Sequence, residues 1–369
     1  MKDAKYLIAY IAPLSAVGGL YYGGWWSFGM TYVAFGLIPF FELFLPKSVE
    51  NHAAEVEEDR SRHPFFDWLL YAHVPIMYVL IAWACVKLQN GGLSSLEIVG
   101  TTFNIGIMIG AFGINVAHEL GHRNTKFEQF LSKTLLLPAL YQHFFIEHNR
   151  GHHKNVATPI DPASSRLGEN LYAFWWRSVK DSYLDAWKIE SERLRREGKS
   201  WFRIENEMLR FQFIQLAYLG VIWVAFGTPS VIFAIFAAVI GFLLLETVNY
   251  IEHYGLQRKM LENGRYEPVL PHHSWNSDHE LGRIFLYELT RHSDHHYKAT
   301  RKYQVLRHFD ESPQLPFGYP MCMLLSLVPP LWFGVMDKRV IRNYELGISR
   351  VRKIFLFFLN MFYYILSQP

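Results

Sequence analysis

Long, mostly apolar blocks with few or no charged residues alternate with polar and charged segments along this chain of 369 residues. Six of the blocks approach or reach the roughly 20 residues that an α-helix needs to cross about 30 Å of hydrocarbon. They cover residues 6–22, 26–45, 66–88, 98–117, 211–226 and 231–251. The pattern predicts six membrane-spanning helices, and the fifth is the weakest because it is short and contains Gln212 and Gln215.

Positive charge is concentrated on one side of the predicted helices. Three connections contain no Lys or Arg, at residues 23–25, 89–97 and 227–230. By contrast, residues 119–209 contain 14 Lys and Arg residues, and residues 252–369 are also basic. Under the positive-inside rule, both of these segments and both termini are assigned to the cytoplasm. The expected fold is a single all-α integral membrane domain over residues 1–369, with a cytoplasmic helical cap.

Three further apolar stretches are expected to lie at the cytoplasmic interface rather than to span the bilayer. They are Leu131–Ile146, Met321–Met336 and Ile354–Leu366. The first is short and is interrupted by Lys133 and Pro138. If the last two both spanned, the basic link between them would lie on the outer side, against the positive-inside rule.

Charge and cysteine content argue against two kinds of function. A formal net charge of +3 is too small to suggest nucleic-acid binding. The two cysteines, Cys85 and Cys322, are far apart in the sequence and indicate neither a disulfide framework nor a cysteine-ligated metal site.

Histidines carry the clearest chemical signal in the chain. Of 17 histidines, nine fall in four compact clusters that read HELGH, EHNRGHH, NYIEHYG and RHSDHH. The nine are His118, His122, His148, His152, His153, His253, His292, His295 and His296. All four clusters lie in the predicted cytoplasmic segments or at the cytoplasmic ends of helices.

The spacing of these histidines favours metal binding. Residues four apart on a helix share one face, and three pairs have this spacing: His118/His122, His148/His152 and His292/His296. The adjacent His153 and His295 would point away from their neighbours, so one helical turn could serve two ions. Nine imidazoles exceed the about four positions of a tetrahedral site and the about six of an octahedral one. Two metal ions are therefore expected.

Each cluster also has a simpler interpretation. A single histidine such as His253 at a helix end is often only hydrogen-bonded. HELGH matches the H-E-x-x-H motif of zinc proteases, in which Glu119 would activate a zinc-bound water, but this leaves seven clustered histidines unused. A metal transporter should carry metal-binding residues through the membrane depth, and the first four predicted helices contain few before their cytoplasmic ends.

The four motifs together resemble those of the integral-membrane alkane 1-monooxygenases, within the group of histidine-rich membrane di-iron hydroxylases and desaturases. The resemblance extends to VATPIDPASSRLGENLY after the second motif, PHHSWNSDH at residues 271–279 and TRKYQVLRHF after the last. It covers roughly Leu45 to Lys338. Desaturases and arene-methyl hydroxylases share the general pattern and are the nearest alternatives, but EHNRGHH and RHSDHH favour alkane hydroxylation.

The resemblance implies two non-haem Fe ions, O₂ as oxidant, and terminal hydroxylation of medium-chain n-alkanes taken from the membrane. An unactivated C–H bond offers no charge or acidic proton, so the chemistry also requires a redox metal. The resemblance further implies electrons from a separate rubredoxin with an NAD(P)H-dependent rubredoxin reductase, and a location in the bacterial inner membrane. Two cysteines cannot build a fused rubredoxin site.

Polar residues beside the motifs are expected to accept hydrogen bonds from the ligand imidazoles and so orient them. These candidates are Glu119, Glu147, Asp161, Asn249, Glu252 and Asp294. Glu246 lies within the sixth predicted helix, where a carboxylate usually faces the protein interior and is a functional candidate. His272, His273 and His279 are left outside the ligand set because their spacing gives no convergent pair.

Two surface features remain open to more than one interpretation. A lateral substrate channel could be lined by aromatic residues of the first two helices, although most of these should face the bilayer. The aromatic candidates are Trp25, Trp26, Phe35 and Phe40. A basic run could steer an acidic electron donor or be an ordinary positive-inside loop. It comprises Lys188, Arg193, Arg195, Arg196 and Lys199.

Overall fold

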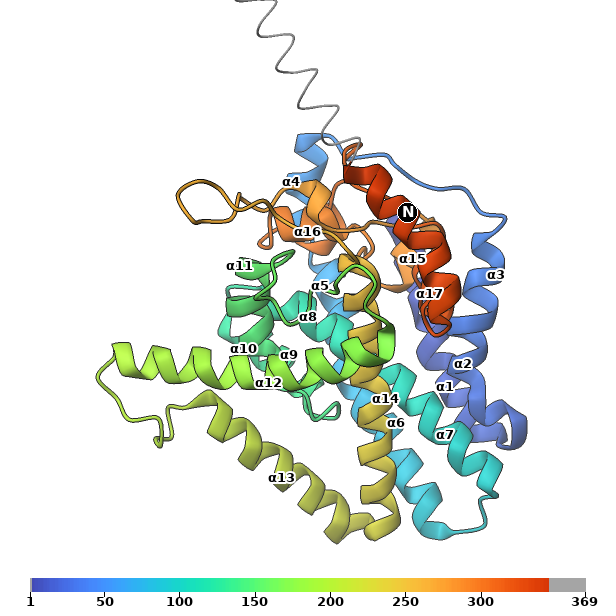
Figure 1. The fold of residues 1–369 in the computed structure, drawn as a ribbon. Helices are drawn as coiled ribbons and strands as arrows, with labels where there is room; N and C mark the ends of the chain where they lie inside the picture. Colours follow the sequence, from blue (N-terminus) through green and yellow to red (C-terminus); the bar gives the residue numbers. More distant parts are fainter. Residues whose placement is uncertain (1, 345–369) are drawn as a thin grey trace, which may run out of the picture.

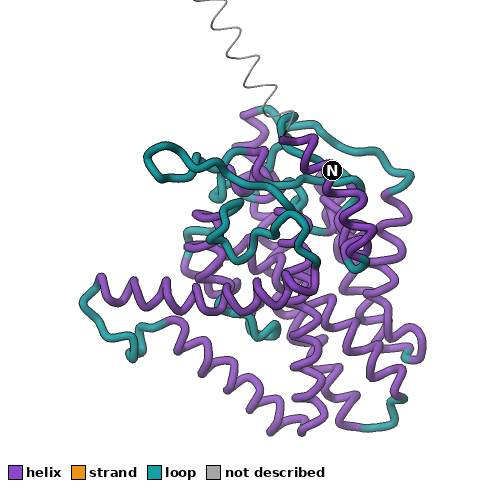
Figure 2. Tube along the Cα trace, viewed as in Figure 1, coloured by secondary structure: helices purple, strands orange, loops and turns teal. Residues whose placement is uncertain are grey.

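The computed structural model describes residues 2–344, which form helices joined by loops, with isolated β-bridges in place of strands. Four helical segments are long and apolar enough to cross a membrane: Pro64–Asn90, Ser95–Gly121, Glu207–Phe226 and Thr228–His253. They correspond to the third to sixth predicted spans. Figure 1 shows these segments in the lower part of the view, and Figure 2 shows most of the loops gathered above them.

Local sequence signals set the ends of these spans. The elements are α5 (Pro64–Tyr71), α6 (His73–Asn90), α7 (Ser95–Met108), η4 (Ile109–Ile114), α8 (Asn115–Gly121), α13 (Glu207–Phe226) and α14 (Thr228–His253). α7 begins with a capping box, because Ser94 and Glu97 each accept a hydrogen bond from the other's backbone N–H. Asn206 caps α13, which ends at Gly227 with φ 78°.

The first two predicted spans form a hairpin of short helical pieces beside α7 (Figure 1). The pieces are η1 (Lys2–Tyr10), α1 (Ile11–Tyr22), η2 (Gly24–Phe28), α2 (Gly29–Tyr32), η3 (Val33–Leu37) and α3 (Ile38–Glu42). Gly23 and Gly24 make the turn with φ of 66° and 52°, a conformation that glycine adopts without steric cost. The regular helix expected over residues 26–45 is instead a succession of 3₁₀, α and π turns.

Glycines bring the second and fourth of the long spans into close contact. Gly106 and Gly110 are four residues apart on one face of α7 and η4, where they meet α14. A Cβ at Gly241 would lie 2.6 Å from Ile109 Cγ2, and a Cβ at Gly110 would lie 2.9 Å from the Gly241 carbonyl oxygen. Small residues at this spacing allow two helix backbones to approach closely.

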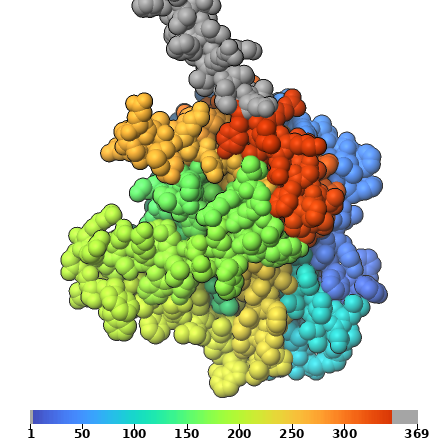
Figure 3. All heavy atoms as spheres, viewed as in Figure 1, coloured from blue at the N-terminus to red at the C-terminus, as the bar shows by residue number. Residues whose placement is uncertain are grey.

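The remaining helices form a cap over one end of the spans. They are α4 (Ala54–Arg62), α9 (Lys126–Leu136), α10 (Phe144–Glu147), η5 (His148–His152), α11 (His153–Asn155), α12 (Leu171–Arg196), η6 (Pro271–His273), α15 (Glu280–Phe285), α16 (His292–Tyr297), η7 (Tyr303–Val305) and α17 (Tyr319–Ser326). α12 crosses the bundle as a long rod and forms part of a continuous surface with its neighbours (Figure 3).

A buried carboxylate fastens the cap to the spans. Glu246 in α14 accepts hydrogen bonds from the Tyr141 hydroxyl at 2.8 Å and the Ser178 hydroxyl at 2.5 Å. Tyr141 precedes α10 and Ser178 lies in α12, so one side chain joins three segments. Glu246 therefore faces the protein interior, as its position in the sixth predicted span indicated.

The predicted interfacial segments prove to be short helices. Within residues 131–146, α9 ends at Leu136 and α10 begins at Phe144. The stretch over residues 321–336 is divided between α17 and a second helical segment over residues 329–344. The stretch Ile354–Leu366 lies outside the described residues.

The glycine contact predicts that Gly241→Ala destabilises the protein. The added methyl group would meet Ile109 and force the helices apart, at a cost of about 1–3 kcal/mol. Thermal unfolding in detergent should show a lower midpoint. Gly220→Ala in α13 is the matched control, because a Cβ there meets nothing within 4 Å. Equal midpoints for the two variants would contradict the close contact.

Candidate metal centre

The structure brings all nine clustered histidines together in two groups. In each group the nitrogen atoms that could bind a metal ion lie within 4.8 Å of one another. One group contains His118, His122, His148, His153 and His295. The other contains His152, His253, His292 and His296. Each group draws on segments that are far apart in the sequence.

The distances between imidazole nitrogens suit metal coordination. In the five-histidine group, Nε2 of His148 lies 3.1 Å from that of His122 and 3.0 Å from that of His153. In the four-histidine group, Nε2 of His292 lies 3.2 Å from that of His253 and 2.9 Å from that of His296. Two nitrogens bound at about 2.1 Å to one ion are about 3.0 Å apart at right angles and about 3.4 Å apart at the tetrahedral angle. The spacing fits coordination numbers above four.

A π turn makes one of the expected histidine pairings wrong. His148 and His152 were predicted to share an ion, but the structure places them in different groups. The reason is that residues His148–His152 form a π-helix, in which the N–H of His153 donates to the carbonyl of His148 five residues earlier. His153 is thus brought over His148, whereas His118/His122 and His292/His296 keep the expected pairing.

Burial favours the neutral form of the imidazoles outside the membrane-spanning segments whose pKa is shifted. Desolvation, and after it the neighbouring histidines, lowers the pKa of His148, His153, His292, His295 and His296 well below the ordinary value. Desolvation also lowers the pKa of His122 to about 3. Nε2 of His152 is buried without a hydrogen-bond partner. Neutral, unpartnered nitrogens of this kind are what a metal ion requires, and a bound ion offsets the cost of burying them.

Of the six polar candidates, Asp161 acts on a clustered histidine as expected. Its Oδ2 accepts hydrogen bonds from His152 Nδ1 at 2.9 Å and from the Ser164 hydroxyl at 2.6 Å. Burial alone would raise the pKa of Asp161, but these two partners hold it below its ordinary range. The bond leaves the proton of His152 on Nδ1, so Nε2 is free to bind a metal ion.

Glu252 lies even closer to the metal-facing atoms. Its Oε1 accepts from the Tyr319 hydroxyl at 2.8 Å, and its Oε2 lies 3.2 Å from Nε2 of His292. The Tyr319 hydroxyl therefore fixes one oxygen and leaves the other beside the histidine nitrogens. Tyr319 was missed by the sequence analysis, because it lies 67 residues from Glu252 in the chain.

The other four candidates bond elsewhere. Glu119 accepts from Arg123, Asp294 accepts from Arg301, and Asn249 donates to Glu246. Glu147 lies beside Gly151, and burial together with nearby carboxylates raises its pKa well above the ordinary value. The hydrogen bonds given for Glu119, Asn249 and Asp294 therefore go to side chains other than imidazole.

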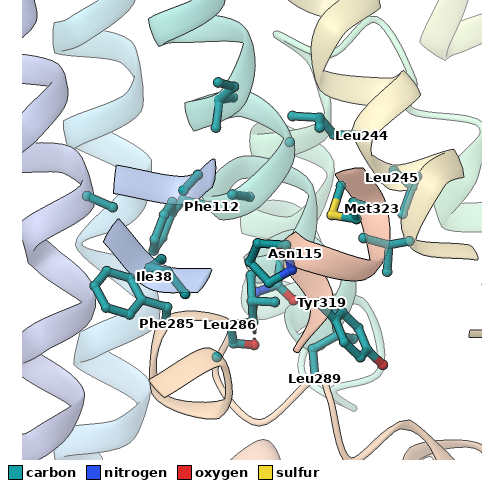
Figure 4. Close-up of a pocket in the computed structure, with 18 of the residues that line it drawn as sticks. Ile38, Phe112, Asn115, Leu244, Leu245, Phe285, Leu286, Leu289, Tyr319 and Met323 are labelled. Atoms are coloured by element: carbon teal, nitrogen blue, oxygen red, sulfur yellow. Dashed lines mark hydrogen bonds between the residues drawn. The ribbon is translucent and has the colours of Figure 1, made fainter. Parts of the chain in front are cut away.

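An apolar cavity ends at the histidines. It lies between the N-terminal hairpin, α7, η4, α14, α15 and α17, and His118, His148 and His292 form part of its lining. Figure 4 shows Phe112, Leu244, Phe285 and Met323 around this space, with the Asn115 amide donating to the Leu286 carbonyl. Because that amide is already bonded, it leaves the wall apolar.

The structure separates the aromatic channel candidates. Phe35 lines the cavity. Trp25, Trp26 and Phe40 are 70%, 65% and 55% exposed, as expected for bilayer-facing side chains.

The histidines left outside the ligand set lie apart from the two groups. His272 and His273 come together with Glu267, and His279 lies 2.9 Å from the Ser277 hydroxyl. Nδ1 of His273 accepts from the backbone N–H of Leu270 at 3.0 Å, so its proton lies on Nε2. A nitrogen that carries a proton is not available to a metal ion.

Three of the five cations in the basic run pair with neighbouring acids. Arg193 pairs with Glu190 and Glu197, and Lys199 also pairs with Glu197. Arg196 lies 3.6 Å from Glu192. This pattern favours an ordinary solvated helix end over a steering surface.

Comparison with known proteins gives a consistent picture. A family model for fatty acid desaturases matches residues 96–324. The chain is 41% identical to alkane 1-monooxygenase 2 of Pseudomonas aeruginosa over 90% of this chain and 92% of that protein. It is 39% identical to the alkane 1-monooxygenase of Acinetobacter baylyi over 85% and 77% of the two chains. It is 28% identical to the xylene/toluene monooxygenase hydroxylase component of Pseudomonas putida over 94% and 90%.

The hydrogen bond to His152 predicts that Asp161→Asn weakens metal binding. Loss of the carboxylate should lower affinity for the ion at the four-histidine group about 10- to 100-fold, because the imidazole is no longer held in one tautomer. Competition with a chelator would measure this. Asp185→Asn is the matched control, since the described contacts of this nearby carboxylate include no histidine. An unchanged affinity in Asp161→Asn would show that the bond does not orient a ligand.

Proposed function

This chain belongs to the fatty acid desaturase family and, within it, to the alkane 1-monooxygenases, and from this premise we propose that it hydroxylates the terminal methyl group of medium-chain n-alkanes. The observation that carries the proposal is the apolar cavity that ends at His118, His148 and His292. A hydrocarbon suits such a space, because burying apolar surface is favourable and needs no polar partner.

The histidine groups and the family together indicate an iron-binding site, and we assign one iron to each group. When bound, the two irons supply the O₂ chemistry that no side chain provides. The overall reaction converts R–CH₃, O₂, two electrons and two protons into R–CH₂OH and water. The nine imidazoles would hold the metal ions as neutral donors, and Asp161 would keep His152 in the required tautomer.

The cavity walls orient the substrate. Phe112 and Phe285 confine an extended hydrocarbon laterally, so that its end meets the histidines. Asn115 and Tyr319 satisfy their polar groups within the protein, and neither needs a polar group on the substrate. The terminal methyl group is thereby presented in preference to internal carbons, because only the end of the chain reaches the histidine wall.

The membrane delivers the substrate. The chain is an integral membrane protein, and the N-terminal hairpin would complete six spans, since its exposed side chains are apolar, with Leu14 65% and Phe44 73% exposed. Alkanes dissolve in the bilayer, and the hairpin forms one wall of the cavity. The charge distribution supports an inner-membrane location with the cap and the termini in the cytoplasm.

The electrons would come from a separate rubredoxin and its NAD(P)H-dependent reductase. Cys85 and Cys322, the cysteines of this chain, are both buried and far apart in sequence, so the chain does not carry a four-cysteine iron site of its own. His122 and His153 are the partly exposed members of the five-histidine group, and they form the edge nearest to a soluble donor.

The alternatives fit less well. A zinc protease would use His118 and His122, but three further histidines converge on them, and Glu119 is bonded to Arg123. An arene-methyl hydroxylase is a closer competitor, although the chain is only 28% identical to that relative against 41% for an alkane 1-monooxygenase. A membrane desaturase shares the family and is distinguished by its product.

Metal content and product together test the function. Purified protein should contain about two irons per chain and convert octane to 1-octanol with rubredoxin, reductase, NADH and O₂. His148→Ala and His253→Ala should each lose about one iron and at least about 100-fold in rate, because each removes a ligand from a different group. His143→Gln is the control, as a buried histidine outside both groups. One zinc, or an alkene product, would overturn the assignment.

The cavity predicts a chain-length effect. Ala111 lines it, so Ala111→Phe should shorten the usable space. Turnover of the longest alkane accepted by the wild type should fall about tenfold or more, while that of short alkanes stays within about threefold. Product analysis across an n-alkane series would measure this, with the exposed Ala217→Phe in α13 as the control. A uniform loss across all lengths would show that Ala111 does not limit the substrate.

A further inference from the structure

A row of oxidisable aromatic side chains leads away from the cavity. His73 stacks on Phe112 with ring centres 5.2 Å apart, and its ring centre lies 5.6 Å from that of Tyr287. Tyr287 is followed by Tyr303 at 5.4 Å, and Tyr303 by Tyr6 at 5.8 Å. Ring separations of this size allow an electron to hop from one side chain to the next.

The two ends of the row lie at functionally different places. At the inner end, Phe112 shares the cavity wall with His118, and the carbonyl of Leu286, next to Tyr287, accepts a hydrogen bond from Asn115. Asn115 is about one helical turn from His118. At the outer end, Tyr6 lies in the floor of a polar cleft formed by the start of the chain, the loop after α3, and α15.

The phenols at both ends of the row have a base within hydrogen-bond distance. The Tyr287 hydroxyl lies 2.7 Å from Nε2 of His73, and the Tyr6 hydroxyl donates to Glu288 Oε1 at 2.5 Å. An oxidised phenol is a strong acid, so a tyrosine gives up an electron readily only where a base takes its proton. The middle member, Tyr303, donates instead to the Phe66 carbonyl at 3.1 Å. Because that carbonyl is not a base for its proton, its oxidised form would be short-lived.

We propose that Tyr287, Tyr303 and Tyr6 carry electrons from the polar cleft to the metal centre when O₂ has reacted and no alkane is bound. This inference rests on the proposed function, because it takes O₂ as the oxidant. In an empty cavity the oxidant can attack the imidazoles and the nearby Met323 and Tyr319, so an inward supply of electrons protects these side chains.

The electrons and protons of this protective reaction balance. Reduction of O₂ to two waters takes four electrons and four protons. The donor protein supplies two electrons, and two thiol molecules at the cleft supply the other two as they form a disulfide and release two protons. Two further protons come from solvent. On oxidation the phenol protons of Tyr287 and Tyr6 move to His73 and Glu288, and they return on reduction, so these tyrosines are unchanged after each cycle.

Tyrosine variants test the route in the complete enzyme. Tyr303→Phe and Tyr287→Phe keep the ring packing and remove the phenol, whereas Tyr78→Phe is the matched control because its hydroxyl, like that of Tyr303, donates to a backbone carbonyl. With alkane, all three should form alcohol within about twofold of wild type. With O₂ and reductant but no alkane, the first two should accumulate oxidised histidine about fivefold faster than wild type and the control.

A radical measurement adds a readout that packing alone would not move. Freeze-quenched, alkane-free samples should show a tyrosyl radical in wild type and Tyr78→Phe, and this radical should be lost or displaced in Tyr303→Phe. Equal histidine damage in all four proteins, or a radical unchanged by Tyr303→Phe, would overturn the proposal. Failure to form any alcohol from alkane would instead count against the proposed function.

A light-driven experiment decides the route without iron. Val49 lines the cleft and is 53% exposed, whereas Cys85 and Cys322 are buried, so a ruthenium photosensitiser can be attached selectively to Val49→Cys. Flash oxidation of metal-free protein should produce a tyrosyl radical that falls about tenfold or more in Tyr6→Phe. In Tyr303→Phe the radical should form but remain at Tyr6. A yield that is unchanged in Tyr6→Phe would exclude Tyr6 as the outer end.

Discussion

The rest of the structure depends on one constraint: nine imidazoles are brought together, with some of their nitrogens about 3 Å apart, and must stay neutral. Water would solvate and protonate them, so they are enclosed between the ends of the spans and the cap. The same enclosure lowers the pKa values of His148 and His292 and leaves nitrogen atoms without protein partners. The proposed pair of iron ions would supply the partners that these buried nitrogens lack.

Departures from regular helix geometry serve this arrangement. The π segment over His148–His152 places His148 and His153 in the five-histidine group and His152 in the four-histidine group. A second π segment, η4, precedes His118 at the point where the glycine contact draws α14 close. Packing of the surrounding helices compensates for the free-energy cost of the irregular backbone. As a result, the short segment His148–His153 contributes to both histidine groups.

Different kinds of surroundings meet at the enclosed histidines. The apolar cavity borders the membrane-facing hairpin, whereas Asp161 contacts His152 from the loop before α12. Glu252 lies beside His292 from the end of α14. The row of tyrosines Tyr287, Tyr303 and Tyr6 ends at a polar cleft. An apolar cavity that excludes water allows oxidation of an unreactive bond, and it also makes a protective supply of electrons useful when that bond is absent.

The sequence by itself determined the long apolar spans, the four histidine motifs and the family, because hydrophobic length and short motifs are local properties. It also pointed to Asp161 as a partner of a histidine, although Glu119 and Asp294 satisfy arginines instead. Tertiary structure alone decided how the nine histidines divide into groups of five and four, which carboxylates reach them, and where the cavity runs. Those outcomes depend on one π turn and on contacts such as Tyr319 with Glu252, which join residues distant in the chain and leave no periodic signal in it.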